Sequence, residues 1–540
     1  MTSRRDLALL ALLGALLFLP GLGLRDLWNP DEARYAEVAR EMRLESSWVI
    51  PRLNGEVYTQ KPPLFFWLII ASSYVTGGVS EVSARLPSAL SAIGSILLVF
   101  LLGERLFNRR AGWIAAAAFG TCYKILWQGQ FGQIDMLLTF LVALGIWFWV
   151  RGYTEKRPGL YPLFFVATGL ATLAKGPAGF LLPLLAIVAF LLITKERDEI
   201  RRMRIGLGFL IWAAVVLAWL IPAGIAGGRE YLDQIAFKQT VTRYADPWHH
   251  FQPWYYYLSV IPPEFFPWSF LLPTALVAGW KSADRKGYLF ALCWIVVTLV
   301  FFSVSPAKRT VYILTMYPAM ALLVGAALDR IAAEWPRWRR WTVWPLGLLA
   351  AFVLLLTAAV PIAGLGRKEA APLGGDVFAW QLTLALLPLL AGALYAWWQA
   401  RDGRLPRAAA GLAAGIGTFG LLATLFLIPK FDAFKSTREM SRELVARMRP
   451  GDTYGIYPRL DSTLVFYTGR FAVELDSEQK LLEYARRPGV WVLAQRDDLA
   501  RLREPLPLKQ IATDADVWEG YVLFSKDNQG HQGPQGRQGQ

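Results

Sequence analysis

The chain has 540 residues, of which 55% are hydrophobic, and it carries a formal net charge of +15. Apolar runs of roughly 17 to 22 residues recur from Leu7 to Ile428, and each is long enough to cross a hydrocarbon core of about 30 Å. The runs lack strand alternation, so the composition excludes a soluble globular protein and predicts a polytopic α-helical membrane protein. The basic residues lie in short clusters between the apolar runs, a pattern typical of cytoplasmic loops, which argues against a nucleic-acid partner.

The N-terminal segment has the charged start of a signal peptide, but no small-residue cleavage site precedes the first polar loop. We therefore expect the apolar run from Leu7 to Leu24 to remain as the first helix. The two cysteines, Cys122 and Cys293, lie inside apolar runs. This placement argues against a disulfide framework and against a cysteine metal site.

The stretch from Asn29 to Lys61 is a strongly charged loop between two apolar segments. Pro30 should end the preceding helix, Asp31 is expected to cap a new one, and the spacing predicts a helix over Ala33 to Leu44. Its apolar face consists of Tyr35, Val38, Ala39 and Met42. We predict a short helix along the membrane surface, with the acidic pair of Asp31 and Glu32 at its positive N-terminal end. Any loop that leaves a bilayer is polar, but this pair also suits a general base or a metal ligand.

The apolar stretch from Pro62 to Gly77 is just short of the usual spanning length. If it crossed the membrane, the next apolar segment would deliver the basic loop at Arg105 to the outer face. If it lies on the surface, all the basic loops fall on the inner side, as the distribution of Lys and Arg in membrane proteins requires. These loops are Arg105–Arg110, Arg151–Arg157, Lys195–Arg204, Lys281–Lys286, Arg330–Arg340 and Arg401–Arg407. The topology then has about 13 spanning helices, an inner N-terminus and an outer C-terminus.

This topology predicts three parts of the chain. Residues 1–430 form the membrane domain, whose outer loop over residues 25–85 carries two surface-lying helices. Residues 431–525 contain a helix-like stretch and short apolar runs separated by Gly and Pro, which predicts a small α/β domain on the outer face. Residues 526–540 are rich in Gln and Gly and are predicted to be disordered.

The predicted topology brings polar residues from distant parts of the chain to the outer face. Asp31 and Asp135 are carboxylates that could position an acceptor or, together with His249, hold a divalent metal. Further candidates for binding the donor or its phosphate are Arg34, Tyr35 and Tyr58 of the first loop, and Tyr317, which follows a basic pair farther along the chain. The cations on this face could form a receptor for phosphate at the level of the lipid headgroups. They are Lys61, Lys175, Arg243, Lys308 and Arg309.

These residues also have simpler interpretations. A single Lys or Arg at a helix end is often an anchor that snorkels to the interface, and Asp135 could cap the helix that it opens. Adjacent histidines usually point apart, so His249 and His250 are poor joint ligands. The aromatic stretch PWHHFQPWYYYL fits an interfacial aromatic belt better than a sugar platform. Several cations on the face that should be poor in positive charge nevertheless favour a functional site.

A set of motifs runs along the chain: NPDEARYAEVAREM, PRLNGEVYTQKPPLFFW, FGQIDMLLTF, LAKGP, WYYYL and SPAKRTVYILTMYPAMALL. In this combination the chain resembles the GT-C superfamily of integral-membrane glycosyltransferases, and within it the aminoarabinose lipid A transferases. Protein O-mannosyltransferases are similar at greater distance. The resemblance covers nearly all of residues 1–430 and extends weakly into the outer domain.

The resemblance implies a multi-pass enzyme of the bacterial inner membrane with a periplasmic active site. Its donor would be a sugar, 4-amino-4-deoxy-L-arabinose, on undecaprenyl phosphate. Its acceptor would be a lipid A phosphate or, in other relatives, a hydroxyl of a protein or polysaccharide. By motif position, Asp31 matches the family's catalytic aspartate. Other residues of the family's active-site cavity match Lys61, Asp135, Lys175 and Tyr317.

One departure from the pattern concerns metal binding. The lipid A enzymes carry Glu before the KP lysine, whereas this chain has Gln60. An amide is a poorer ligand for a divalent cation than a carboxylate. We therefore predict that no cofactor is required, while a divalent metal on Asp31, Asp135 or His249 stays open.

The expected chemistry is a single displacement at the anomeric carbon with inversion, in which undecaprenyl phosphate leaves. The charge of the leaving group would be met by Lys61, Arg243 or the pair of Lys308 and Arg309. With a hydroxyl acceptor, Asp31 would be the base; with a phosphate acceptor, it would orient the nucleophile.

Two other classes of function are open. A transporter or flippase of lipid-linked sugars would favour inverted repeats and broken helices near the bilayer midplane. An assembly scaffold for cell-envelope synthesis would tolerate the loss of Asp31. The gathering of charge at one face favours the glycosyltransferase over both.

Overall fold

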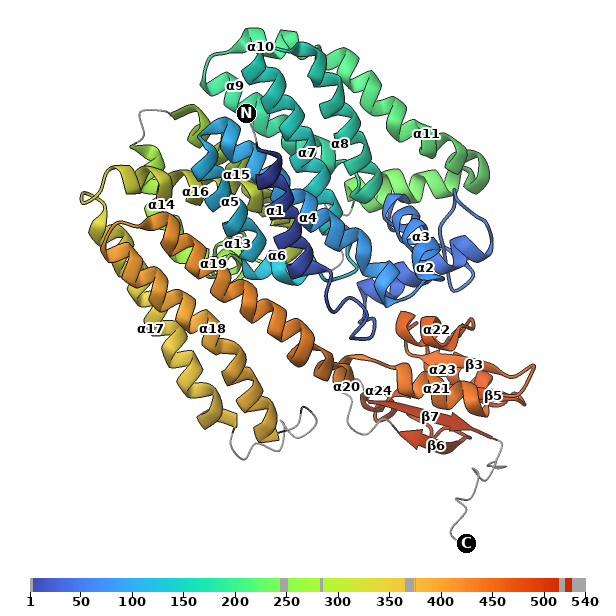
Figure 1. Cartoon of the computed structure of the whole chain (residues 1–540). Helices are drawn as coiled ribbons and strands as arrows, with labels where there is room; N and C mark the ends of the chain where they lie inside the picture. The colour runs from blue at the N-terminus through green and yellow to red at the C-terminus, as the bar shows by residue number, and fades with distance from the viewer. Residues whose placement is uncertain are drawn as a thin grey trace.

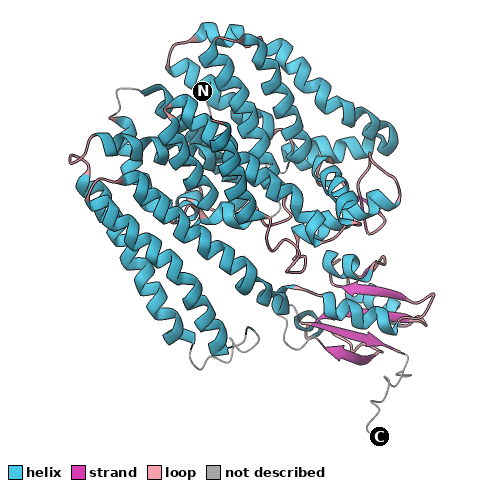
Figure 2. Ribbon diagram, in the orientation of Figure 1, coloured by secondary structure: helices cyan, strands magenta, loops and turns pink. Residues whose placement is uncertain are grey.

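The structure, a computed structural model, describes residues 3–242, 251–281, 285–364, 373, 375–513 and 520–526. It consists of a helical bundle followed by a small α/β unit (Figure 1 and Figure 2). The longer helices of the bundle are α4 (Glu81–Leu106), α7 (Ile134–Glu155), α11 (Ile205–Leu232), α15 (Arg285–Val304), α16 (Tyr317–Ala333), α17 (Arg339–Gly364), α18 (Gly375–Arg401) and α19 (Leu405–Leu422). The shorter ones are α1 (Arg4–Phe18), α5 (Arg109–Thr121), α6 (Tyr123–Gln128), α8 (Tyr161–Lys175), α9 (Ala178–Ile193), α10 (Arg197–Arg202), α13 (Tyr256–Glu264) and α14 (Leu272–Trp280). Single 3₁₀ or π segments occupy Pro158–Leu160, Asp233–Thr242, Trp268–Leu271, Thr310–Met316, Ala423–Leu427 and Ile428–Phe431.

The bundle is that of a multi-pass membrane protein. Within the described residues, eight helices are long and apolar enough to cross a membrane, or nine if the bent pair Tyr256–Glu264 and Trp268–Trp280 forms one span. Other helices of the bundle are shorter, with 15 residues in α1, 13 in α5 and 15 in α8. The count of about 13 crossings therefore stays a prediction.

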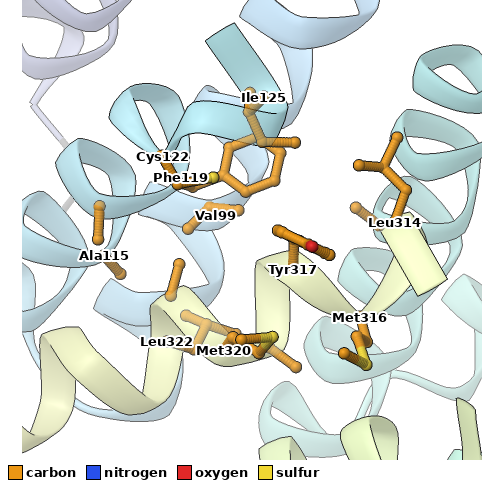
Figure 3. Close-up of a cluster of buried hydrophobic side chains, with 14 of the residues drawn as sticks. Val99, Ala115, Phe119, Cys122, Ile125, Leu314, Met316, Tyr317, Met320 and Leu322 are labelled. Atoms are coloured by element: carbon orange, nitrogen blue, oxygen red, sulfur yellow. The ribbon is translucent and has the colours of Figure 1, made fainter. Parts of the chain in front are cut away.

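Small residues let the central helices α4, α5 and α16 approach closely. A Cβ added to Gly103 of α4 would lie 2.6 Å from the Cα of Gly112 in α5. A Cβ on Gly325 of α16 would lie 2.5 Å from the carbonyl oxygen of Ala111. Because helices in lipid associate through van der Waals packing, small residues at their crossings stabilise the bundle. Figure 3 shows part of the apolar core between these helices, including Val99, Phe119, Met320 and Leu322.

The basic loops lie together at one end of the bundle. Arg105 lies 3.6 Å from Glu155, and Lys286 lies 2.7 Å from Glu196. The N-terminus joins the same end, because Asp6 lies 2.7 Å from Arg109. The loop after α14 does so through the carbonyl of Lys281, which accepts from Arg330 at 2.8 Å. The loop after α18 does so through Gly403, which lies against the ring of Trp335. This segregation of charge agrees with the topology predicted from the sequence.

The first loop folds into α2 (Asp31–Leu44), a hairpin of β1 (Arg52–Leu53) and β2 (Glu56–Val57), and α3 (Leu64–Thr76). The prediction that Asp31 caps the new helix is wrong, because α2 begins at Asp31 and Pro30 takes the cap position without a side-chain hydrogen bond. With proline already turning the chain, Asp31 enters the first helical turn, where its carboxylate still faces the positive end of the helix.

Helices α2 and α3 run side by side. Near their first turns, the ring of Tyr35 lies 5.8 Å from that of Phe65. Near their last turns, the guanidinium of Arg43 lies 5.1 Å from the ring of Tyr74. The two helices therefore share one orientation, and if α2 lies on the membrane surface, α3 does so as well.

The C-terminal unit contains α20 (Asp432–Lys435), α21 (Arg438–Arg447), β3 (Thr453–Tyr457), α22 (Ser462–Thr468), β4 (Val473–Glu474), α23 (Glu478–Ala485), β5 (Val490–Gln495), α24 (Arg496–Leu499), β6 (Lys509–Thr513) and β7 (Tyr521–Ser525). Its described strands form one sheet in the order β4-β3-β5-β7-β6. Strand β3 pairs in parallel with β4 and β5, whereas β7 pairs antiparallel with β5 and β6. The glutamine-rich tail that the sequence predicts to be disordered lies outside the described residues from 527 onward.

The C-terminal unit packs against the segment that leads into α2, with α22 near α2 (Figure 1). The hydroxyl of Tyr467 accepts from the backbone N–H of Leu27 at 2.7 Å and donates to Glu81 at 3.1 Å. The carboxylate of Asp432 accepts from the N–H of Asp26 at 2.9 Å and from the indole of Trp28 at 2.6 Å. The backbone segment that leads into α2 is therefore held by side chains of α20 and α22.

Candidate active site

Asp31 lies where three segments of the chain meet. Its Oδ2 accepts from Nη2 of Arg309 at 3.2 Å and from the amide of Gln133 at 3.0 Å. Arg34, one turn along α2, lies 3.7 Å from Oδ1. The Asp31 side chain is buried, and two guanidinium groups therefore surround this carboxylate.

Asp135 forms a second charged pair in the same region. It opens α7, and its carboxylate pairs with the ammonium of Lys175, the last residue of α8. The ammonium also lies 5.1 Å from the ring of Tyr312. Asp31 and Asp135 both act on Arg309. Burial lowers the pKa of this guanidinium, but its neighbours, first Asp31 and then Asp135, together outweigh that effect and raise the pKa above its ordinary value. The two pairs therefore form one electrostatic cluster.

The first loop supplies the side of the cluster that surrounds Arg34. Nη1 of Arg34 donates to the side-chain oxygen of Gln60 at 3.0 Å, and the Arg34 guanidinium also interacts with the hydroxyl of Tyr58. Lys61, the residue after Gln60, is half-buried. The ring of Tyr35 is buried under this layer, against Phe65 and Phe66.

Lys308 and Tyr317, which the sequence placed among the phosphate-binding residues, have other contacts. The Lys308 ammonium is buried and donates to the carbonyl of Ser305 at 2.6 Å and to that of Gln252 at 3.0 Å. It thus orders the loop that carries Arg309. The hydroxyl of Tyr317 donates to Glu264 inside the bundle at 2.8 Å. Arg243 and His249, with Asp246 and His250, lie outside the described residues.

A buried pair of Lys124 and Glu264 was not predicted from the sequence. The Lys124 ammonium lies 2.6 Å from Glu264 and donates to the hydroxyl of Thr310 at 2.9 Å. Because Thr310 follows Arg309 directly, this pair supports the position of the arginine that contacts Asp31. A lysine in the apolar stretch before FGQID was the sequence signal that could have identified it.

Glu32 was read together with Asp31 as one acidic pair, but the structure separates the two. Glu32 is fully buried and lies 2.6 Å from Arg25 and 2.9 Å from Arg85. It also accepts from the backbone N–H of Gly132 at 2.8 Å. Burial alone would raise the pKa of Glu32, but the two arginines outweigh it and hold the pKa at about 2. Glu32 is therefore the anchor of the loop, and Arg85 inside an apolar helix was the sequence signal for it.

The carboxylates do not assemble a metal centre in the part of the chain that the structure describes. Groups of three or more His, Cys, Asp or Glu side chains with suitable geometry are absent from these residues. Asp31 and Asp135 instead face cations, and the oxygen of Gln60 accepts from Arg34. The two described carboxylates of this cluster are thus paired with cations and not with each other.

The fold is that of a GT-C glycosyltransferase. The solved structure of ArnT from Cupriavidus metallidurans bound to undecaprenyl phosphate superposes with a TM-score of 0.79 and 23% identity, covering 98% of this chain and 99% of that one. The model of the dolichyl-phosphate-mannose-protein mannosyltransferase family matches residues 60–221.

Several curated relatives carry the name undecaprenyl phosphate-alpha-4-amino-4-deoxy-L-arabinose arabinosyl transferase. That of Pectobacterium carotovorum subsp. carotovorum (strain PC1) is 33% identical over 65% of this chain and 64% of its own length. That of Erwinia tasmaniensis is 29% identical over 71% of this chain and 72% of its own length. The chain thus spans about two thirds of the length of these relatives, and its predicted resemblance to the aminoarabinose transferases of the GT-C superfamily is confirmed.

Proposed function

We propose that the protein transfers 4-amino-4-deoxy-L-arabinose from undecaprenyl phosphate to a cell-envelope acceptor, with a lipid A phosphate as the first candidate. The observation that carries this proposal is the position of Asp31, which lies between Arg34 and Arg309 next to the pair of Asp135 and Lys175. The donor and the sugar come from the names of the relatives. A hydroxyl of a protein or polysaccharide is the alternative acceptor.

The reaction replaces one bond at the anomeric carbon by another. The acceptor oxygen attacks this carbon from the side opposite the phosphate, and the bond to the phosphate oxygen breaks with its electron pair. Undecaprenyl phosphate then leaves with a second negative charge, which Arg309, Arg34 and Lys61 would stabilise. Preorganised cations of this kind usually make the largest single contribution to such catalysis.

The role of Asp31 depends on the acceptor. A hydroxyl must lose its proton as it attacks, and Asp31 is then the general base. A phosphate acceptor is already anionic, and the carboxylate then orients the nucleophile through the residues that hold it. In both cases Gln133 and Arg309 fix the direction of the carboxylate.

We place this site on the periplasmic face of the bacterial inner membrane. The support is the gathering of the basic loops at the opposite end of the bundle, because such loops are retained in the cytoplasm. The α/β unit of residues 431–525 packs against the segment that leads into α2 and would share the outer side. Helices α2 and α3 would then lie on the outer surface.

The test is transfer by purified protein in proteoliposomes that contain undecaprenyl phosphate–aminoarabinose and lipid A, with the product identified by mass spectrometry. Asp31→Asn should lower the turnover by at least about 100-fold. Asp198→Asn is the matched control, because this carboxylate is 89% exposed in the loop that carries α10. Full activity of Asp31→Asn would remove the proposed role. Movement of the donor across the bilayer without product would instead favour a flippase.

A further inference from the structure

A cavity lies at the other end of the bundle from Asp31. It has a volume of about 350 Å³ and is lined by the start of α8, the end of α10 and the first turns of α11. Helix α8 separates the two sites, since its first residue, Tyr161, lines this cavity and its last, Lys175, pairs with Asp135. At 1.5 Å per residue this helix is about 22 Å long. The cavity therefore lies among the basic loops, far from the candidate active site.

The cavity combines an apolar wall with a basic rim. Arg202 and Arg204 form the rim. The wall consists of Pro162, Phe165, Leu207 and Ile211. Gly208 also lines the cavity, and a Cβ added there would lie 2.1 Å from the ring of Phe165, so α11 and α8 approach closely at this glycine.

The surrounding loop carries an excess of positive charge. Residues 195–204 contain five basic side chains and three acidic ones, which leaves a net charge of +2. Glu199 is buried and already engaged, since it accepts from the hydroxyl of Tyr161 and lies 3.3 Å from Arg202. Arg204 is exposed and makes no ion pair within the described part of the chain. An anion in the cavity would therefore meet Arg204 directly, with Arg202 beside it.

The wall of the cavity continues onto an exposed apolar face of α11. Only 11% of the most apolar stretch of α11 is buried inside the protein. Leu207, which lines the cavity, is 49% exposed, and Leu210 on the next turn is 64% exposed. A soluble anion would use the rim alone, whereas a molecule with a charged head and apolar chains would use both the rim and the wall.

We propose that this cavity binds one anionic phospholipid of the inner leaflet. Its phosphate lies between Arg202 and Arg204, and its acyl chains follow Leu207 and Ile211 along α11. Anionic lipids of the cytoplasmic leaflet are attracted to basic residues at the membrane surface, and basic pockets between helices on that side bind their headgroups. The volume falls within the range of ligand pockets, roughly 300–1,000 Å³. This binding does not depend on the proposed sugar transfer.

The test compares lipid binding by full-length protein in detergent, measured by native mass spectrometry with phosphatidylglycerol and with phosphatidylcholine. We expect phosphatidylglycerol to bind at least about tenfold more tightly than phosphatidylcholine. The double variant Arg202→Ala/Arg204→Ala should weaken phosphatidylglycerol binding roughly 10- to 30-fold, since each basic residue near the surface contributes about 1 kcal/mol. Arg197→Ala/Arg201→Ala is the matched control, because it removes two charges from the same loop without touching the cavity.

A third variant tests the wall without changing the charge. Leu207→Trp narrows the cavity and should weaken phosphatidylglycerol binding while leaving the basic rim intact. Gel filtration and the thermal midpoint without added lipid check that each variant is folded. Equal losses in the two double variants would overturn the proposal in favour of general surface charge. Displacement of the lipid by millimolar inorganic phosphate, or an unaffected Leu207→Trp, would overturn it in favour of a soluble anion.

Discussion

Arg309 donates to the carboxylate of Asp31 at 3.2 Å, which joins two residues that are 278 positions apart in the sequence. This bond links the first loop to the start of the segment that leads into α16. It is one of the contacts that bring the two carboxylates and the cations of the site together. The position of Arg309 itself depends on Lys308, which binds two carbonyls of its loop, and on Lys124, which holds Thr310.

Replacing Arg309 should impair the transfer of the sugar more than the binding of the donor. Arg309→Ala removes a cation beside Asp31 and should lower the turnover about 100- to 1,000-fold, as the loss of one preorganised donor does in other enzymes. Arg309→Lys keeps the charge but loses the planar guanidinium, so we expect a smaller loss of turnover. Steady-state kinetics with the undecaprenyl-linked donor measure the turnover of both variants. A change in KM alone, with unchanged turnover, would contradict this role.

Replacing Glu32 should destabilise the protein rather than change its chemistry. Glu32→Gln leaves Arg25 and Arg85 buried without a counter-charge, which costs about 3–5 kcal/mol in comparable cases. The thermal midpoint in detergent should fall by several degrees. Asp198→Asn, on an exposed loop, is the control and should leave the midpoint unchanged. A midpoint of Glu32→Gln equal to that of the wild type would show that the network is not stabilising.

The same carboxylate predicts a dependence on pH. The pKa of Glu32 is lowered from 4.5 to about 2 in the folded protein. A lowered pKa stabilises the fold above the unfolded value, and this contribution, roughly 3 kcal/mol, is lost as the pH falls from about 4.5 to about 2. The difference in thermal midpoint between wild type and Glu32→Gln should therefore shrink over this range. A constant difference down to pH 2 would contradict the assignment.

Activity should survive removal of divalent metals. The described carboxylates of the site face Arg309 and Lys175, and Gln60 accepts from Arg34. Transfer measured in EDTA should therefore equal transfer in its absence. Gln60→Glu should form an ion pair with Arg34 and likewise remain insensitive to EDTA. Loss on chelation with recovery by one specific metal would indicate ligands such as His249, beyond the described residues.

Contacts of the C-terminal unit should order the segment before Asp31. Tyr467→Phe removes the acceptor of the Leu27 N–H and the donor to Glu81, and an unsatisfied buried group costs about 1–3 kcal/mol. Hydrogen exchange of residues 26–32 should become faster. Tyr457→Phe, on β3 of the same unit, is the control. Unchanged exchange in Tyr467→Phe would show that the unit does not hold this segment.

The placement of α3 can be tested with single cysteines. Thr76 is exposed at the end of this helix, whereas Arg201 is 88% exposed among the basic loops. Native Cys122 and Cys293 are buried and should react little. A membrane-impermeant thiol reagent should label Thr76→Cys from the periplasm and Arg201→Cys only from the cytoplasm. Labelling of Thr76→Cys only from the cytoplasm, with Arg201→Cys labelled from the periplasm, would mean that α3 crosses the membrane.

The membrane class and the charge segregation followed from the sequence because they depend on composition and spacing alone. Apolar runs of spanning length leave few other structures open in lipid. The basic loops form contacts with one another at one end, as the distribution of Lys and Arg predicted. The acidic start of α2 was also recognisable, since a proline and two carboxylates at the beginning of a periodic stretch mark a helix N-terminus.

Only the tertiary structure decided what each polar residue does. Asp31 and Glu32 are neighbours, but successive residues of a helix point about 100° apart. Asp31 therefore contacts Arg309, which is 278 positions away in the sequence, whereas Glu32 contacts Arg85, which is 53 positions away. In the same way, Tyr317 meets Glu264 and Lys308 meets backbone carbonyls. The local pattern of a helix sets the direction of a side chain, whereas its partner is set by the packing of segments that are distant in the sequence.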